Sequence, residues 1–365
     1  MQTPATKNVV IREAVAKDFP AVRQCMADVF GERPGQKTRD FSSALWHWQY
    51  LEAEHGSLVL LAEDDGLVCG YYHAVILPMV HDGRNALAAM VQDVGTRSSH
   101  RKRGIFRQMG RLALELLDRR GVDFIYTFPN VFSLPSFVRD HQYTVVTQVP
   151  VYAAPLRAGP LCRERLHLGH VGEAFGMLLD PLLHALLLHR EPLQKGEEIR
   201  RISEFDGDIL PIRDELMQRT RIALDRTPPY LNWRFFRKPT HEYSGWGIRR
   251  DGGLQAYVVM RAANIFSVDC TLLMDFGCRA GERSTLCRLV SECLRVEMLS
   301  GRALAVTMGS HPDLIALQKA GFIRLPGRFN PRIFNLVVKN VGGDTGRELL
   351  DPANWTMTLA DWDVY

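Results

Sequence analysis

The stretch TRSSHRKRGIFRQMGRLALELLDRRG, Thr96–Gly121, places three consecutive basic residues directly before a glycine and then continues as an amphipathic segment. From Phe106 onward the apolar residues have helical spacing, and Gly121 suits the end of a helix because glycine readily adopts the left-handed conformation found there. The residues before the loop, LAAMVQDVGT (87–96), have the composition of a strand. The sequence therefore predicts a strand, a basic glycine-containing loop and a helix in direct succession.

The predicted loop is suited to binding an anion. Backbone N–H groups at the start of a helix have no carbonyl partner within it, and they lie at the positive end of the helix dipole. Gly104 would let the backbone approach a phosphate or pyrophosphate, while Arg101, Lys102 and Arg103 add positive charge. A solvated basic loop without a ligand is the alternative. A Walker loop is excluded, since no G-x-x-x-x-G-K-[ST] pattern occurs.

Neighbouring segments complete an α/β domain. Residues 9–12 form an alternating run that is typical of a strand, and Asp18 is placed to cap a following helix. Two apolar runs within residues 57–77 are joined by an Asp-Asp-Gly turn (64–66) of the kind that closes antiparallel hairpins, and DFIYTF (123–128) is a further strand. The predicted order is β-α-(α)-β-β-β-α-β.

Three motifs of this order return later in the chain, each displaced by about 180 residues. The pairs are WHWQYL (46–51) with LNWRFF (231–236), VQDVGT (91–96) with LMDFGC (273–278), and RDHQYTVV (139–146) with QKAGFIRL (318–325). Because the displacement differs only slightly from one pair of motifs to the next, the pattern indicates a tandem duplication. Where the first copy has its basic loop, the second has RAGERSTL (279–286) without a basic triplet, so only the first copy is predicted to bind the anion.

Composition and charge indicate a soluble globular protein. The 365 residues suffice for two domains, with 46% hydrophobic residues and a formal net charge of +4, which argues against a nucleic-acid partner. No apolar run reaches the roughly 18 to 20 residues of a membrane helix. The most apolar stretch, 175–190, is interpreted as a buried or interdomain helix. The N-terminus lacks a secretory signal, which favours the cytoplasm, and seven cysteines without a C-x-x-C pair predict reduced thiols and no metal site.

The basic loop and the segment after it resemble the GCN5-related N-acetyltransferases (GNAT), and within them the tandem type. The features that carry the resemblance are a strand, R-x-x-G-x before a helix (101–105), and a second strand closed by FPN (128–130) and a short S-x-P segment (133–135). The resemblance covers residues 8–150 and, more weakly, 230–330. It implies two tandem α/β domains, each a mixed, mostly antiparallel central sheet flanked by helices, with a degenerate second copy.

The expected domain boundaries follow from the repeat and the resemblance. An N-terminal acetyl-CoA-binding domain is expected at 1–155, a linker with its own helix at 156–201, a degenerate C-terminal domain at 202–340 and a C-terminal tail at 341–365.

The resemblance implies acetyl-CoA as the acyl donor. In this family the R-x-x-G-x-[GA] loop binds the pyrophosphate through backbone N–H groups, and the preceding strand diverges from its neighbour to hold the pantetheine arm and the acetyl carbonyl. The corresponding cofactor-binding positions are Arg101, Lys102, Arg103, Gly104, Ile105 and Phe106 in the loop and Val94 and Thr96 on the strand. Phe106 departs from the family's preference for glycine or alanine. Asn130 either reaches the cofactor arm or satisfies backbone groups of a turn.

Acetyl transfer to an amine needs a neutral amine, a polarised thioester carbonyl and a proton for the departing thiolate. The tyrosine that many family members use as the acid is absent, because Val138 and Leu317 stand at its position in the two copies. Tyr126 or Ser133 could supply the proton instead, or the thiol, with a pKa of about 8.5, could leave without an acid. Asp93 is the candidate base, or a hydrogen-bonded strand carboxylate.

The C-terminal tail offers another candidate base. NWTMTLADWDVY (354–365) is rich in aromatic and apolar residues, unlike a frayed end. In some tandem acetyltransferases the chain end returns to the first domain's site, and its carboxylate is the base. By this resemblance Asp361, Asp363 or the α-carboxylate of Tyr365 could attract a cationic amine; a packing segment or edge strand is the alternative. His73 is interpreted as structural.

We therefore expect a cytoplasmic enzyme that transfers an acetyl group from acetyl-CoA to a primary amine by direct attack in a ternary complex. A small-molecule acceptor, such as an amino sugar, an antibiotic or a metabolite, is expected rather than a protein. No nucleic-acid, membrane or metal partner is predicted, and a homo-oligomer is left open. The alternatives are a longer-chain acyl donor and a non-catalytic CoA-binding sensor or scaffold.

Overall fold

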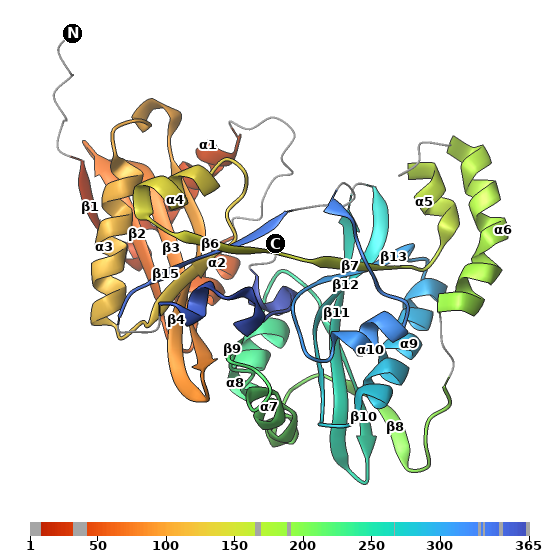
Figure 1. Ribbon diagram of the computed structural model, residues 1–365. Helices are drawn as coiled ribbons and strands as arrows, with labels where there is room; N and C mark the ends of the chain where they lie inside the picture. The colour runs from red at the N-terminus through yellow and green to blue at the C-terminus, as the bar shows by residue number, and fades with distance from the viewer. Residues whose placement is uncertain are drawn as a thin grey trace. The chain divides into compact units, whose positions relative to one another are not determined.

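Figure 1 shows the computed structural model of the protein, which describes residues 9–31, 42–164, 169–187, 191–265, 267–327, 330, 333–342 and 346–362. The chain forms two compact units. The first consists of Met1–Thr147, Phe334–Pro352 and Tyr365, and the second of Gln148–Ile333 and Ala353–Val364. Each unit has a sheet and a hydrophobic core of its own.

The first unit is built on a mixed sheet with strands in the order β1-β2-β3-β4-β5-β15-β6. Its elements are β1 (Val10–Glu13), α1 (Phe19–Gly31), α2 (Ser43–Tyr50), β2 (Ser57–Asp64), β3 (Leu67–His81), β4 (Arg84–Thr96), α3 (Ile105–Arg119), β5 (Phe124–Thr127), α4 (Leu134–His141), β6 (Thr144–Val149) and β15 (Phe334–Asn340). The pairs β1–β2, β2–β3, β3–β4 and β5–β15 are antiparallel, and β4–β5 is parallel.

Helices cover both faces of this sheet. Residues of α3 pack on one face with Tyr72 of β3, and residues of α1 pack on the other face with Tyr71, because successive side chains of a strand point to opposite faces. The β2–β3 turn has Asp65 and Gly66 at φ values of 50° and 82°, which is the conformation that the predicted Asp-Gly hairpin turn requires. The predicted strand, loop and helix of the opening motif are confirmed as β4, residues 97–104 and α3.

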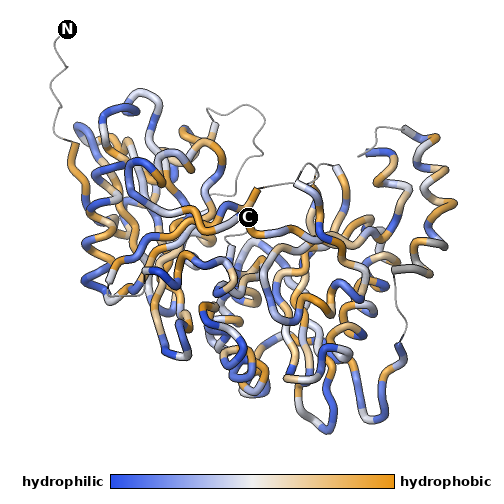
Figure 2. The backbone as a smooth tube through the Cα atoms, viewed as in Figure 1, coloured by the Kyte–Doolittle hydropathy of each residue, from blue (hydrophilic) through white to orange (hydrophobic). Residues whose placement is uncertain are grey.

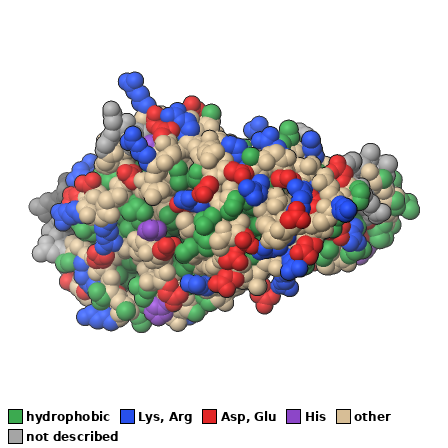
Figure 3. Space-filling view, turned by 90° about the horizontal axis from the view of Figure 1, so that it is seen from below, with side chains coloured by type: hydrophobic (Ala, Val, Ile, Leu, Met, Phe, Trp, Pro, Cys, Tyr) green, Lys and Arg blue, Asp and Glu red, His purple; other side chains and the backbone are tan. Residues whose placement is uncertain are grey.

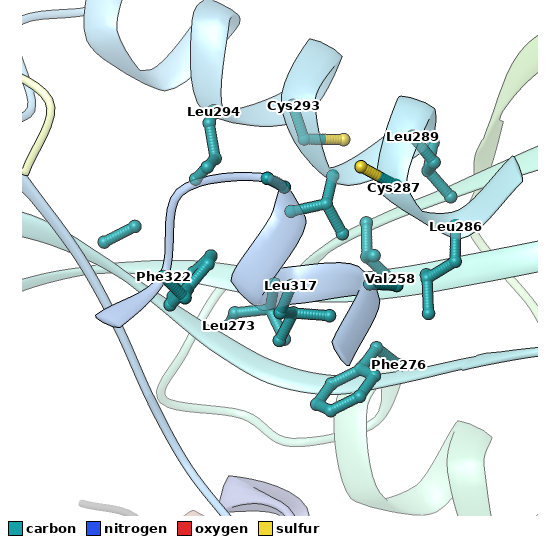
Figure 4. Close-up of a cluster of buried hydrophobic side chains, with 14 of the residues drawn as sticks. Val258, Leu273, Phe276, Leu286, Cys287, Leu289, Cys293, Leu294, Leu317 and Phe322 are labelled. Carbon is teal, nitrogen blue, oxygen red and sulfur yellow. The ribbon is translucent and has the colours of Figure 1, made fainter. Parts of the chain in front are cut away.

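The second unit repeats the arrangement, with strands in the order β14-β7-β13-β12-β11-β10-β8. Its strands are β7 (Val151–Pro155), β8 (Glu197–Ile202), β9 (Ile222–Leu224), β10 (Ser244–Arg250), β11 (Gly253–Ile265), β12 (Val268–Cys278), β13 (Leu304–Met308), β14 (Ile323–Arg324) and β16 (Trp355–Thr356). Its helices are α5 (Ala158–Glu164), α6 (Gly169–Leu187), α7 (Leu210–Met217), α8 (Pro228–Leu231), α9 (Arg283–Leu299) and α10 (Leu314–Lys319). In the core, Leu273 and Phe276 of β12 pack beneath α9 and α10 (Figure 4).

The boundaries of the units differ from the expected 1–155 and 202–340. Strand β7, from the first half of the sequence, pairs with β13 of the second unit, and β15, from the second half, pairs with β5 of the first. The expected linker, 156–201, forms α5, α6 and most of β8 within the second unit. Each unit thus contains one strand from the other half of the sequence.

The most apolar stretch, 175–190, was expected to form a buried or interdomain helix; residues Gly169–Leu187 form α6, and several of its apolar side chains are exposed. Val171, Phe175 and Leu178 have exposed fractions of 83%, 59% and 79%, and apolar colouring follows this helix in Figure 2. These side chains are thus not buried, although α6 packs on α5, where a Cβ on Gly176 would lie 2.6 Å from the N atom of Gly159. No described helix combines the length and hydropathy needed to span a membrane.

Acidic and basic side chains are interspersed over the face of the molecule shown in Figure 3. A face of mixed charge creates no extended field of one sign, which is the electrostatic feature that attracts nucleic acids.

Candidate active site

The sheet of the first unit opens between its two parallel strands. Their register pairs Ala88 with Phe124 and continues only as far as Met90 with Tyr126. At the end of the pairing, the hydroxyl of Thr127 donates to the carbonyl O of Val91 at 2.7 Å. Beyond this point no described strand pairs with the side of β4 that faces β5, so the backbone groups there can bind an extended ligand.

A bulge in β4 marks the same position. Asp93 pairs with His73 of β3, but Val91 pairs with the next residue, Ala74, so Gln92 is the extra residue. A bulge bends its strand and increases the local twist. It therefore helps to turn the end of β4 away from β5.

The second unit has the same opening, as the sequence repeat predicts. The pairing of β12 with β13 ends at Leu272–Val306, and the hydroxyl of Thr307 donates to the carbonyl O of Leu273 at 2.8 Å. A register shift on the β11 side leaves Met274 as the extra residue and places Asp275 at the position of Asp93. Both copies thus have an opening between parallel strands, a threonine at its base and an aspartate after a bulge.

The basic loop of the first unit presents backbone donors at the start of α3. Lys102 and Gly104 have φ values of 64° and 72°, which fold the chain sharply into the helix. The N–H of Gln108 donates to the carbonyl O of Gly104 at 3.0 Å; the N–H groups of Ile105 and Phe106 precede this bond and have no carbonyl partner in the helix. The surroundings of Gly104 are open, since a Cβ there would have only the side-chain Nε2 of Gln108, at 3.8 Å, within 4 Å.

The basic side chains of the loop differ in their roles. Arg103 donates to Asp64 at 2.8 Å, and the Nε2 of His100 lies 3.3 Å from the same carboxylate. The hydrogen bond from Arg103 lowers the pKa of Asp64. Arg101 is exposed and donates through Nε to the carbonyl O of Thr96 at 3.1 Å, and Lys102 is exposed. Arg103 therefore anchors the loop to β2, while Arg101 and Lys102 lie at the surface.

The packing of Phe106 explains how it can stand where the family prefers glycine or alanine. Its ring centroid lies 5.5 Å from that of Phe137 and 4.3 Å from that of His141, both on α4. The ring thus fills the space between α3 and α4 and leaves the backbone N–H at the helix start. Burial in this contact lowers the pKa of His141 to about 4.

The remaining cofactor-binding candidates lie around the opening. Val94 is half-buried against the core beneath α3, and Ile105 is buried in that core. Thr96 pairs with Gly70 at the last position of β4. Val94 and Thr96 therefore lie on the part of β4 that has passed the end of its pairing with β5.

Asp93 lies in a buried cluster with two aromatic side chains. Its side chain is 2% exposed and accepts a hydrogen bond from the hydroxyl of Tyr50 at 2.9 Å. His73, its partner in the β3–β4 register, is fully buried, and its ring centroid lies 4.7 Å from that of Tyr50. The sequence interpretation of His73 as structural did not associate it with Asp93. The antiparallel pairing of β3 with β4 places His73 opposite Asp93, and this register is the signal that could have linked the two residues.

The structure places Asn130 and Ser133 together in the turn that begins α4. The side-chain oxygen of Asn130 accepts from the N–H of Phe132 at 2.9 Å, the N–H of Ser133 at 3.0 Å and the Ser133 hydroxyl at 3.2 Å. Tyr126, by contrast, is fully buried at the last paired position of β5. The oxygen of Asn130 and the hydroxyl of Ser133 thus satisfy the turn, while the amide NH₂ of Asn130 takes no part in these contacts.

In the second unit, an arginine and the C-terminal segment satisfy the aspartate after the bulge. Asp275 accepts from Arg226 Nη2 at 2.9 Å, from the hydroxyl of Thr358 at 2.8 Å and from that of Tyr257 at 2.8 Å. Arg226 is 1% exposed and also donates to Asp361 at 3.2 Å. Asp361, expected as a candidate for binding an amine, is therefore part of a buried ion-pair network in the second unit. Burial raises the pKa of Asp361.

The chain itself occupies the end of β13. The N–H of Met357 donates to the carbonyl O of Ser310 at 2.7 Å, and the N–H of Ser310 donates back to the carbonyl O of Met357 at 3.0 Å. In the loop before α9, Glu215 accepts a hydrogen bond from the N–H of Ala280 and pairs with Arg279 at 3.4 Å. Protein groups of the second unit thus bind the end of β13 and the loop before α9. Tyr365 and Asp363 lie outside the described residues.

Comparison with known proteins agrees with this geometry. Residues 10–146 match the family model of the acetyltransferase (GNAT) domain. No curated protein matches the sequence.

Similar solved structures cover nearly the whole chain. A probable N-acyltransferase from Enterococcus faecalis is 13% identical with a TM-score of 0.62, over 92% of this chain and 73% of that chain. N-myristoyltransferase from Saccharomyces cerevisiae with bound myristoyl-CoA is 9% identical with a TM-score of 0.62, over 93% and 80%. A tandem GNAT protein from the clavulanic acid biosynthesis pathway is 13% identical with a TM-score of 0.55, over 92% and 100%.

At such identities the solved structures show a shared fold, and the family match adds the enzyme class. Residues 10–146 therefore form an acetyltransferase (GNAT) domain, which places the chain among the N-acyltransferases, and a second unit with the same strand order follows in tandem.

Proposed function

We propose that the first unit binds acetyl-CoA and transfers its acetyl group to the primary amine of a small molecule. The observation that carries the proposal is the difference between the two copies. Both have the opening between parallel strands. In the first, Arg101 and Lys102 are exposed in the loop before the helix, whereas in the second the carboxylate of Glu215 binds that loop and the exposed Arg283 pairs with Asp313. The first copy has the groups that attract a pyrophosphate, and the second has groups that would repel it.

In the proposed complex the pyrophosphate lies at the start of α3. The N–H groups of Ile105 and Phe106 point away from the helix and can donate to phosphate oxygens, and the open side of Gly104 allows the close approach. Arg101 and Lys102 add charge at the surface. The pantetheine arm then follows β4 at Val94 and Thr96, where the strand has lost its partner, and the amide NH₂ of Asn130 is a donor for the arm.

Asp93 is the proposed base of the reaction. Its carboxylate lies directly after the bulge and accepts a neutral hydrogen bond from the Tyr50 hydroxyl at 2.9 Å. A carboxylate at this position can stabilise the ammonium form of an approaching amine and accept its proton during attack. The carboxylate of Tyr365 remains the alternative base.

The thiolate of CoA can leave with or without an acid. Tyr126 is the candidate acid nearer to the opening between β4 and β5, because it is the last residue of β5 that pairs with β4. Ser133 donates its hydroxyl to Asn130 and would have to give up that bond. A thiol pKa of about 8.5 also permits departure as the anion, which solvent then protonates.

We propose titration calorimetry with acetyl-CoA as the test, comparing the wild type with Gly104→Asp. The added carboxylate lies beside the proposed pyrophosphate, so we expect binding to be lost. Gly121→Asp is the matched control: Gly121 ends the same helix with φ 73°, against 72° for Gly104, and a Cβ there meets nothing within 4 Å. The C-terminal end of a helix is the negative end of its dipole, where an added carboxylate is less favourable than at the N-terminal end. Gly121→Asp should therefore lose at least as much stability as Gly104→Asp. Equal binding by Gly104→Asp and wild type would refute the assignment of the loop.

Release of CoA thiol in the presence of amines then separates an enzyme from a CoA sensor. A series of acyl-CoA donors of increasing chain length addresses the alternative of a longer chain, which the fold shared with N-myristoyltransferase makes worth testing. Turnover that falls steadily beyond acetyl-CoA supports the proposed donor, and turnover that rises with chain length contradicts it.

A further inference from the structure

A second group of chemically competent side chains lies at the far end of β4 from the cofactor loop. His81 ends β3, Asp82 begins the turn into β4, and Glu348 belongs to the segment that follows β15 in the same unit. Strand β4 runs from Arg84 at this end to Thr96 at the loop, which corresponds to about 40 Å of strand. This group is therefore separate from the candidate active site.

The imidazole of His81 is buried, yet its outer nitrogen has no hydrogen-bond partner. His81 is 7% exposed, and no described residue makes a hydrogen bond of good geometry with its Nε2. Burial of a polar atom without a partner costs about 1 to 3 kcal/mol. The Nε2 is nevertheless directed at two carboxylates, lying 3.2 Å from Oε2 of Glu348 and 3.7 Å from Oδ2 of Asp82.

These separations are those of ligands that share a metal ion. With metal–ligand distances of about 2.1 Å, two ligands at a tetrahedral angle lie about 3.4 Å apart. The two distances from His81 Nε2 lie on either side of this value, and all three donor atoms lie within 4.8 Å of one another. The group therefore has the geometry of three ligands around one centre.

The chemistry of the donors favours zinc or a similar divalent transition metal. Imidazole nitrogen is a preferred ligand of Zn²⁺, whereas Mg²⁺ and Ca²⁺ prefer oxygen ligands alone. The side chains of Asp82 and Glu348 are 35% and 40% exposed, so the ion can enter from solvent and a water molecule can complete its coordination. Asp82 has a φ of 48°, and the tight turn fixes it beside His81.

We propose that His81, Asp82 and Glu348 form a binding site for one divalent transition-metal ion of the Zn²⁺ type, with a water molecule as fourth ligand. The ion would connect the β3–β4 turn to the segment after β15. Since β15 reaches this sheet from the second half of the sequence, the site would fasten a distant segment to the first unit. The proposal does not depend on the identity of the acyl donor or the acceptor.

The test is Zn²⁺ titration of the tag-free, chelator-treated full-length protein by calorimetry and by competition with a chromophoric chelator. We expect one equivalent of Zn²⁺ per chain and an increase of Tm on binding, because a ligand of the native state alone stabilises it. His81→Gln and Glu348→Gln should each weaken binding by more than the roughly 10- to 100-fold that loss of an outer-shell partner causes. Asp82→Asn keeps the turn and should weaken it as well.

His55→Gln and Glu54→Gln are the matched controls, because both residues are exposed in the same unit and carry the same functional groups. They should bind Zn²⁺ like the wild type. Substitution with Co²⁺ should give the visible absorption of a four-coordinate ion without thiolate charge-transfer bands, which excludes the cysteines as ligands. Acetyl-CoA binding by each variant verifies that it is folded. Absence of stoichiometric Zn²⁺ binding to wild type, or equal affinity in His81→Gln, would overturn the proposal.

Discussion

Asp93 and Asp275 occupy equivalent positions after a bulge but have different partners. Asp93 accepts a hydrogen bond from a neutral hydroxyl, that of Tyr50, whereas Asp275 accepts from the guanidinium of Arg226, which is nearly inaccessible to solvent. A buried carboxylate that accepts charge-assisted hydrogen bonds from a guanidinium is held firmly in place. This difference in partners supports chemistry at Asp93 and a structural role for Asp275.

At the residue scale, we predict that Asp93→Asn lowers kcat/KM for the amine by about 10²- to 10⁴-fold, the usual contribution of a general base. Asparagine keeps the volume and can still accept the hydrogen bond from Tyr50, so the Kd for acetyl-CoA should not change. Steady-state kinetics and calorimetry measure the two quantities. An unchanged kcat/KM would leave Asp93 with a structural role and direct attention to the carboxylate of Tyr365.

Individual site residues could be predicted from the sequence where the signal is local. The basic residues before Gly104 and the helix after them identify the loop, and the structure has both there. The anchoring of Arg103 by Asp64 and the contact of Phe106 with α4 depend on residues distant in the sequence, and no spacing rule reveals them. The group of His81, Asp82 and Glu348 likewise cannot be found by a search for Cys and His motifs, because Glu348 is far along the chain from His81.

Among the elements, β7 and β15 show the limit of sequence reasoning most clearly. Both have the apolar composition of buried strands, but composition does not specify which sheet a strand joins. Hydrogen bonds along the backbone select β5 as the partner of β15 and β13 as that of β7, so the expected boundaries at 155 and 202–340 did not hold. The repeat itself was detectable because an aspartate followed two residues later by a glycine recurs in VQDVGT and LMDFGC.

The exchanged strands lead to a prediction at the element scale. A fragment of residues 1–147 lacks β15, which lies between β5 and β6, and should therefore fail to unfold cooperatively. Joining residues 334–352 to this fragment by a flexible Gly/Ser linker should restore a cooperative transition, because it supplies the missing hydrogen-bond partner of β5. Thermal and denaturant unfolding followed by circular dichroism measure both. Cooperative unfolding of the shorter fragment would show that β15 is dispensable for the fold.

For the whole molecule, the two units have the same strand order but different occupants in their openings. In the second unit the carboxylate of Glu215 binds the loop before α9, and Thr358 donates a hydrogen bond to Asp275. We predict one acetyl-CoA bound per chain. Calorimetric stoichiometry measures this directly, and Glu215→Gln should not alter the affinity of that site. A stoichiometry of two would contradict the assignment of a structural role to the second unit.

The position of β15 also affects how the protein is made. A ribosome completes residue 147 about 190 residues before it reaches β15, which at roughly 5 to 20 residues per second is a delay of about 10 to 40 s. During this interval the nascent first unit has an open strand edge at β5. Such edges pair readily with other chains, so newly synthesised copies are most vulnerable to aggregation before β15 emerges.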